Sequence, residues 1–165
     1  MAEETHAGHA HHAHGVHTEP SLNRVAFAAT WHCLTGCAIG EVLGVAIGTA
    51  LGWGNLPTIV LAIVLAFFFG YSLTMLPLLR AGLALGAAIP LAFASDTLSI
   101  TVMEIVDNAI ILVIPGAMAA GLSDLLFWGS LAFSLVIAFM AAFPVNRWLI
   151  ARGKGHAVVH AHHAH

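Results

Sequence analysis

Four long apolar stretches, separated by short breaks rich in glycine, proline or polar residues, dominate the chain between residues 25 and 143. An α-helix that crosses a membrane needs about 20 predominantly apolar residues. The stretches that meet this length cover about residues 25–51, 58–79, 97–119 and 125–143. The pattern predicts an all-α fold, an integral membrane bundle of four transmembrane helices.

The segment Ala81–Ala94 lies outside these four stretches. It is apolar, and Pro90 interrupts it. An apolar run of about 10–14 residues is short for a span and is typical of a re-entrant or interfacial segment. We expect Asp96, a residue type that often caps helix N-termini, to open the third transmembrane helix just beyond it.

Composition supports the membrane assignment. Of the 165 residues, 59% are hydrophobic and 8% are charged, and the mean hydropathy is +0.91. A soluble domain carries about 25% charged residues, so this chain lacks the side chains for a fully water-exposed surface. We expect residues 21–150 to form one transmembrane domain surrounded by the lipid bilayer, with no surface for nucleic acid.

Eleven of the twelve histidines lie near the two ends, six within residues 1–20 and five within residues 156–165. Residues 1–20 have almost no large apolar side chains, which predicts a disordered tail. Residues 151–165 are expected to form a second, basic and His-rich tail. His-rich tracts bind metal ions, and the interrupted spacing favours native metal-attracting tails over an added purification tag.

The positive charges predict the orientation. With four spans, all basic residues fall on one side of the membrane, namely Arg24, Arg80, Arg147, Arg152 and Lys154. The positive-inside rule makes that side cytoplasmic, so we expect both termini in the cytoplasm. A fifth span at residues 81–94 would send the C-terminal basic residues outside, which the rule disfavours.

Glycine recurs at every fourth position of the first apolar stretch, at Gly36, Gly40, Gly44, Gly48 and Gly52. Small residues at this spacing line one helix face and allow close packing of membrane helices. We interpret the glycine stripe as a packing seam. It could serve a neighbouring helix, a homo-oligomer or a larger membrane complex.

A second row of residues follows the same helix about 100° further round. Cys33, Cys37 and Glu41 are spaced four apart, and His32 stands beside them. Two buried thiols could be no more than small packing residues. A carboxylate in line with them makes the row a candidate set of metal ligands.

The third apolar stretch contributes a further polar set, formed by Met103, Glu104, Asp107 and Asn108. A charge at the centre of a span costs about 2.5–3.5 kcal/mol on insertion scales, so such groups face the bundle interior and are functional candidates. No lysine or arginine lies within the spans to neutralise them. Buried carboxyl groups are then tolerated when they are protonated, share protons or bind a metal ion.

The types of donor atom indicate which metal ion these residues would bind. Thiolate and thioether sulfur suits copper(I), imidazole suits copper and zinc, and carboxylates widen the choice. The mixture predicts a copper ion first and a zinc ion as the alternative. Because the first and third spans both run outward, residues about 10–15 Å beyond their helix starts should meet. We expect His32 and Cys33 to join Glu104 and Asp107, with Cys37 and Glu41 as a ladder leading outward.

The string His32–Glu41, with the pattern H-C-x-x-G-C-x-x-G-E, resembles the signature of a bacterial membrane family known as domain of unknown function 4396. Met103–Asn108 and the basic end after Pro144 are similar too, so the resemblance covers roughly residues 21–155. It implies a four-span protein of the bacterial cytoplasmic (inner) membrane and supplies no mechanism.

The leading hypothesis is therefore a transition-metal transporter or metal-binding protein of the membrane, not an enzyme. Two alternatives stay open. One is a non-catalytic accessory subunit that packs on a larger complex through the glycine stripe. The other is a membrane thiol oxidoreductase that uses Cys33 and Cys37.

Overall fold

The computed structural model describes residues 21–152, and all regular secondary structure in this range is helical. Helix α1 spans Leu22–Ala50, α2 spans Asn55–Arg80, α3 spans Leu85–Val113 and α4 spans Leu125–Ala151, with a short 3-10 helix, η1, at Ala117–Ala119. All four α-helices are long and apolar enough to cross a membrane. The predicted four-helix membrane fold is confirmed, whereas the two expected His-rich tails lie almost wholly outside the described residues.

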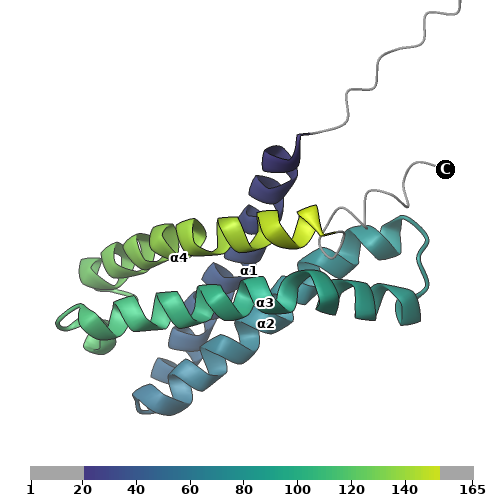
Figure 1. Ribbon diagram of the computed structural model, residues 1–165. Coiled ribbons are helices and arrows are strands. Elements are labelled where there is room, and N and C mark those ends of the chain that lie inside the picture. Colours follow the sequence, from purple (N-terminus) through teal and green to yellow (C-terminus); the bar gives the residue numbers. More distant parts are fainter. Residues whose placement is uncertain (1–20, 153–165) are drawn as a thin grey trace, which may run out of the picture.

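The helices alternate in direction (Figure 1). The start of α1, the α2–α3 turn and the end of α4 therefore lie toward one end of the bundle, which we call the termini end. The α1–α2 turn and residues 114–124 lie toward the other, which we call the loop end. Every arginine in the described part of the chain lies near the termini end.

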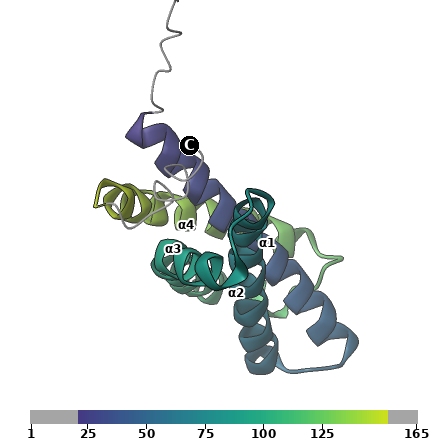
Figure 2. The same cartoon turned by 90° about the vertical axis from the view of Figure 1, so that its right-hand side faces the viewer.

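Helix α1 holds the bundle together because it contacts all three other α-helices, and α2 most extensively. Helix α3 packs against both α2 and α4 (Figure 2). The four helices therefore form a ring in which α1 and α3 also meet across the centre. Side chains on the facing sides of α1 and α3 are thus brought together inside the bundle.

From Gly36 to Gly48 the glycine stripe is a packing seam, and its partner is α2 of the same chain. Gly52 does not belong to the seam, because it lies beyond the end of α1 in a turn with φ +65°, where a Cβ atom would meet nothing within 4 Å. A Cβ atom on Gly36 would lie 2.7 Å from the Gly70 Cα, and one on Gly40 would lie 2.6 Å from the Ala66 Cα. Each step along α1 matches a step back along α2, as in an antiparallel zipper of small residues. Because α2 covers the stripe, it is not free for a second copy or a larger complex, which corrects that expectation.

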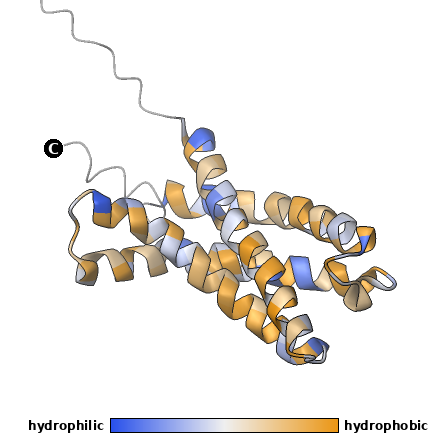
Figure 3. Cartoon of the chain, turned by 180° about the vertical axis from the view of Figure 1, so that it is seen from behind, coloured by the Kyte–Doolittle hydropathy of each residue, from blue (hydrophilic) through white to orange (hydrophobic). Residues whose placement is uncertain are grey.

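The outer face of α2 has the opposite character. Val60, Val64 and Phe68 are spaced four apart and are each more than half exposed. Hydrophobic residues predominate along all four helices (Figure 3). Apolar side chains at helical spacing on an outward face suit contact with lipid.

Three predictions about the third helix are wrong. Residues 85–94 are not a separate re-entrant segment but the first turns of α3, which contains Pro90 within it. A membrane helix tolerates proline because neighbouring groups can satisfy the freed carbonyl. Asp96 is consequently no N-cap: it lies within α3 and is fully buried. The helix also ends earlier than expected, at Val113.

Candidate functional site

Three carboxylic acid side chains lie together inside the bundle, and we call them the acidic cluster. Glu41 comes from α1, and Glu104 and Asp107 come from α3. Their side chains are buried, with exposed fractions of 6%, 4% and 1%. Glu41 lies close enough to the other two for their charges to interact. The sequence therefore predicted that these acids are buried, and the packing of α1 against α3 places their side chains close together.

The local sequence of α3 explains how the two acids on this helix are presented. Glu104, Asp107 and Asn108 are three or four positions apart, so they share one face of the helix. The Asn108 side-chain amide donates a hydrogen bond of 2.9 Å to the Glu104 backbone carbonyl and lies 3.5 Å from Glu104 Oε2. Asn108 thus helps to hold the Glu104 side chain within the bundle.

Helix α4 contributes a residue that the sequence reasoning missed. The Ser134 hydroxyl donates a hydrogen bond to Asp107 Oδ1. A signal for it exists, because small and polar residues recur every fourth position of α4, at Ser130, Ser134, Ala138, Ala142 and Asn146, and all are buried. Such a stripe predicts the face of α4 that points into the bundle.

Some oxygen atoms of the acidic cluster remain without partners. Within residues 21–152, Glu41 Oε1 and Asp107 Oδ2 are buried and have no hydrogen-bond partner. A buried polar atom left unpaired costs roughly 1–3 kcal/mol. These atoms are therefore poised to take up a proton or a cation.

The two cysteines meet different parts of α3. The Cys37 side chain interacts with Glu104, whereas Cys33, one turn nearer the termini end, lies beside Ser99 and Asp96. This differs from the expectation that Cys33 joins Glu104 and Asp107. The expected depths were counted from a helix start at Asp96, whereas α3 begins at Leu85, so those depths do not hold.

The two remaining predicted ligands, Met103 and His32, differ in burial. Met103 is fully buried in an apolar cluster that also contains Cys33 and Cys37. His32, on α1 next to Cys33, is half-buried. The thioether therefore lines the same interior as the thiols, whereas His32 is partly exposed.

Polar contacts continue toward the termini end. The Ser95 hydroxyl donates a hydrogen bond of 2.9 Å to Asp96 Oδ1. The Asn146 side-chain amide donates one of 2.9 Å to the Thr30 hydroxyl, which links α4 to α1. Together with the acidic cluster and the cysteines, these groups form what we call the polar column, which runs through the centre of the bundle.

The donors are strung along this column rather than gathered around one point. Across residues 21–152, no three side chains of histidine, cysteine, aspartate or glutamate are grouped so that they could hold a metal ion. Instead, Cys33 with Asp96 is followed by Cys37 with Glu104, and Glu41 lies one turn further along α1. Such an order can pass a proton or a cation from one group to the next.

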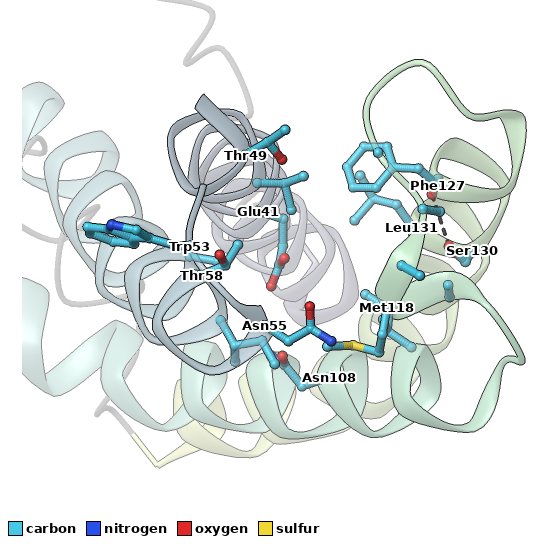
Figure 4. A pocket seen from close by; sticks show the side chains of 18 residues that line it. Glu41, Thr49, Trp53, Asn55, Thr58, Asn108, Met118, Phe127, Ser130 and Leu131 are labelled. Carbon is cyan, nitrogen blue, oxygen red and sulfur yellow. Dashed lines mark hydrogen bonds between the residues drawn. The ribbon is translucent and has the colours of Figure 1, made fainter. Parts of the chain in front are cut away.

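At the loop end the column opens into a pocket of about 250 Å³, which we call the vestibule. Polar residues of α1, α2, α3 and the α1–α2 turn line it, among them Glu41, Thr49, Trp53, Asn55, Thr58 and Asn108. Glu41, Asn55 and Asn108 point into this space (Figure 4). Sequence reasoning missed the vestibule because all four α-helices, η1 and two connecting segments contribute to its wall.

Comparisons with known proteins add a family. The family described as Domain of unknown function (DUF4396) matches residues 22–155, which include all four α-helices. Neither the curated proteins nor the solved structures gave a match.

Proposed function

The chain belongs to the family described as Domain of unknown function (DUF4396), and we propose that it transports a transition-metal cation across the membrane, copper(I) first and zinc second. The observation that supports this most directly is the row of donors that α1 and α3 bring together in the bundle centre. Cys37 and Glu104 interact there, and Glu41 lies near both acids of α3.

Charge balance is the first argument. Glu41, Glu104 and Asp107 are buried together, while the arginines of the described chain lie at helix ends. A central charge in a membrane span costs about 2.5–3.5 kcal/mol on insertion scales, and like charges close together add to that cost. A bound cation offsets both penalties, so the cluster favours positively charged cargo.

Donor chemistry is the second argument. The sulfur atoms of Cys33, Cys37 and Met103 are fully buried along the same interior. Soft sulfur donors favour copper(I), whereas the adjoining carboxylates also accept zinc. Sites that succeed one another along a path bind an ion well enough to admit it and weakly enough to release it. The serial order therefore suits transport better than storage.

We also propose that the termini end faces the cytoplasm of a bacterial inner membrane. The arginines support this orientation, since Arg24, Arg80, Arg147 and Arg152 all lie near that end. The positive-inside rule places such an excess of basic residues on the cytoplasmic side. The vestibule would then open away from the cytoplasm.

Proton transfer is a second candidate. Asp107 accepts a hydrogen bond from Ser134, and both Asp107 and Glu41 have an unpartnered oxygen. Carboxyl groups in series with hydroxyl groups form proton relays in membrane proteins. A proton relay needs no sulfur, so it leaves the two buried cysteines without a role.

The two other hypotheses receive less support. The glycine stripe that an accessory subunit would present to a larger complex is occupied by α2. The thiols that an oxidoreductase would use, Cys33 and Cys37, are each 1% exposed and lie on successive turns of a regular helix. An i,i+4 pair in a regular helix does not offer favourable disulfide geometry.

The test is metal uptake by the full chain in liposomes that contain a fluorescent metal indicator. We expect liposomes with wild-type protein to take up cuprous ions and zinc ions. Glu104→Gln should lower the uptake rate about tenfold or more, because a loss of about 1.4 kcal/mol of stabilisation in the rate-limiting state gives a factor of ten. The matched control is Asp124→Asn, an exposed carboxyl at the loop end, which should leave uptake unchanged. Proton flux without metal uptake would favour the second candidate.

Metal content gives an independent check. Elemental analysis of purified protein should show less bound metal in a Cys37→Ser/Glu104→Gln variant than in wild type. Equal content in the two proteins would contradict a metal path through this pair.

A further inference from the structure

The vestibule combines a buried acid with a polar rim. Glu41 is only 6% exposed, and its Oε1 atom has no hydrogen-bond partner among residues 21–152. Its side chain points into the vestibule, where it meets the space lined by Asn55 and Asn108 (Figure 4). A carboxyl group with a free acceptor, aimed into a pocket, marks a site for a positively charged or hydrogen-donating ligand.

The size of the vestibule limits what it can hold. Its volume of about 250 Å³ corresponds to roughly eight water molecules at about 30 Å³ each. A divalent cation such as zinc(II), the second cargo of the proposed function, therefore fits with a first shell of about six waters. The rim supplies oxygen acceptors for those waters, because Asn55 and Asn108 have amide carbonyls and Thr49 has a hydroxyl.

The ligand types change along the path inward from the vestibule. The polar side chains among the vestibule's lining offer oxygen atoms, which hydrogen-bond a hydrated ion, and Met118 adds one thioether sulfur. One turn beyond Glu41, the interior offers the Cys37 thiol and the Glu104 carboxyl, which bind a metal directly. Glu41 lies at the boundary between these two environments.

We infer that the vestibule is a binding site for a hydrated inorganic metal cation, with Glu41 as the group that replaces part of its water shell. The site admits the ion from the loop end and delivers it to Cys37 and Glu104. This inference rests on the proposed function for its direction of delivery, but binding at Glu41 can be measured without transport.

The experiment is carboxyl modification of the full chain in liposomes. A water-soluble carbodiimide and glycinamide convert an accessible carboxyl to an amide, and mass spectrometry of peptides locates the product. Glu41 should be modified, as should the exposed Asp124 at the same end, which serves as the internal control. Zinc(II) at about ten times its Kd should slow the modification of Glu41 about tenfold, because the free fraction falls as 1/(1 + [L]/Kd).

A steric plug provides matched variants. Thr49 lines the vestibule, whereas its neighbour Ala50 is exposed and lies outside the lining. Thr49→Trp should slow both the modification of Glu41 and metal uptake, and Ala50→Trp should change neither. Both positions are exposed, so both variants should fold.

Two outcomes would overturn the inference. One is modification of Glu41 at the same rate with and without zinc(II), which would show that zinc does not bind at this carboxyl. The other is protection of Glu41 by tetramethylammonium but not by zinc(II), which would assign the site to an organic cation. Zinc protection of Glu41 in protein that takes up no metal would support the vestibule site and refute the transport proposal.

Discussion

Replacing Gly40 with alanine tests how closely α1 and α2 must approach. The added Cβ atom would lie 2.6 Å from the Ala66 Cα and 2.9 Å from the Ala62 carbonyl oxygen. Ordinary contact begins at 3.4 Å, and both neighbours are backbone atoms that cannot rotate away. The two helices must therefore separate locally by roughly 1 Å.

The expected cost follows from two opposing terms. Forcing one extra methyl group into a close-packed interface costs about 1–3 kcal/mol, and a gap of 0.5–1 Å forfeits a quarter to a half of each neighbouring dispersion contact. Alanine gains about 1 kcal/mol over glycine in helix propensity. Because the methyl group meets backbone atoms, its packing cost lies in the upper part of that range, about 2–3 kcal/mol, and we expect Gly40→Ala to lower the free energy of unfolding by about 1–2 kcal/mol.

The assay is thermal unfolding of purified protein in mild detergent, followed by circular dichroism. For a chain of this size, a loss of 1–2 kcal/mol lowers the midpoint by about 2–8 °C. Gly129→Ala in α4 is the matched control, because nothing lies within 4 Å of a Cβ atom there, and it should be neutral or stabilising. A Gly40→Ala midpoint at or above that of wild type would refute the view of the stripe as a tight backbone seam.

Three further outcomes are expected. Thr30→Val should lower the free energy of unfolding by about 1–3 kcal/mol more than Asn146→Leu does, as measured in thermal melts. Thr30→Val leaves the buried Asn146 amide donor without its partner. After Asn146→Leu, the Thr30 hydroxyl keeps its hydrogen bond to the Ala26 backbone carbonyl. Ser134→Ala should lower metal uptake in liposomes, because it removes the hydrogen bond to Asp107. Ser72→Ala in α2, whose hydroxyl bonds to the Phe68 backbone carbonyl, should leave uptake unchanged. Equal rates in the two variants would count against a role for the Ser134 contact. The two native cysteines are each 1% exposed, so they should resist maleimide in the folded protein and react fully after unfolding. Mass spectrometry measures the labelling, and rapid labelling of the folded protein would contradict their burial.

Local patterns in the sequence determined the class of the fold and much of the candidate chemistry. Apolar length gives the four spans, since crossing a bilayer requires about 20 apolar residues regardless of what lies beside them. The four-residue spacing of Gly36 to Gly48 identifies a close-packing face by helix geometry alone. The cost of burying Glu41, Glu104 and Asp107 likewise marks these acids as interior groups.

The incorrect predictions concern residues whose local helix-ending signals had no effect in a membrane-spanning helix. Pro90 and the short apolar run suggested a broken segment, but α3 continues through both. Asp96 has the chemistry of an N-cap, yet it lies within the helix beside Ser95. A membrane helix keeps its hydrogen bonds internal, so a single proline or aspartate ends it less readily than in water.

Which residues meet was decided only by tertiary structure. The fit of Gly40 against Ala66 sets the position of α1, and the true start of α3 sets which of its turns reaches Cys37. A shift of one helical turn, about 5.4 Å, would pair Cys33 rather than Cys37 with Glu104. Partners from distant segments, such as Ser134, and the vestibule wall depend on the same packing. The sequence thus determined which groups are buried in the membrane, and the packing of the helices determined which of them touch.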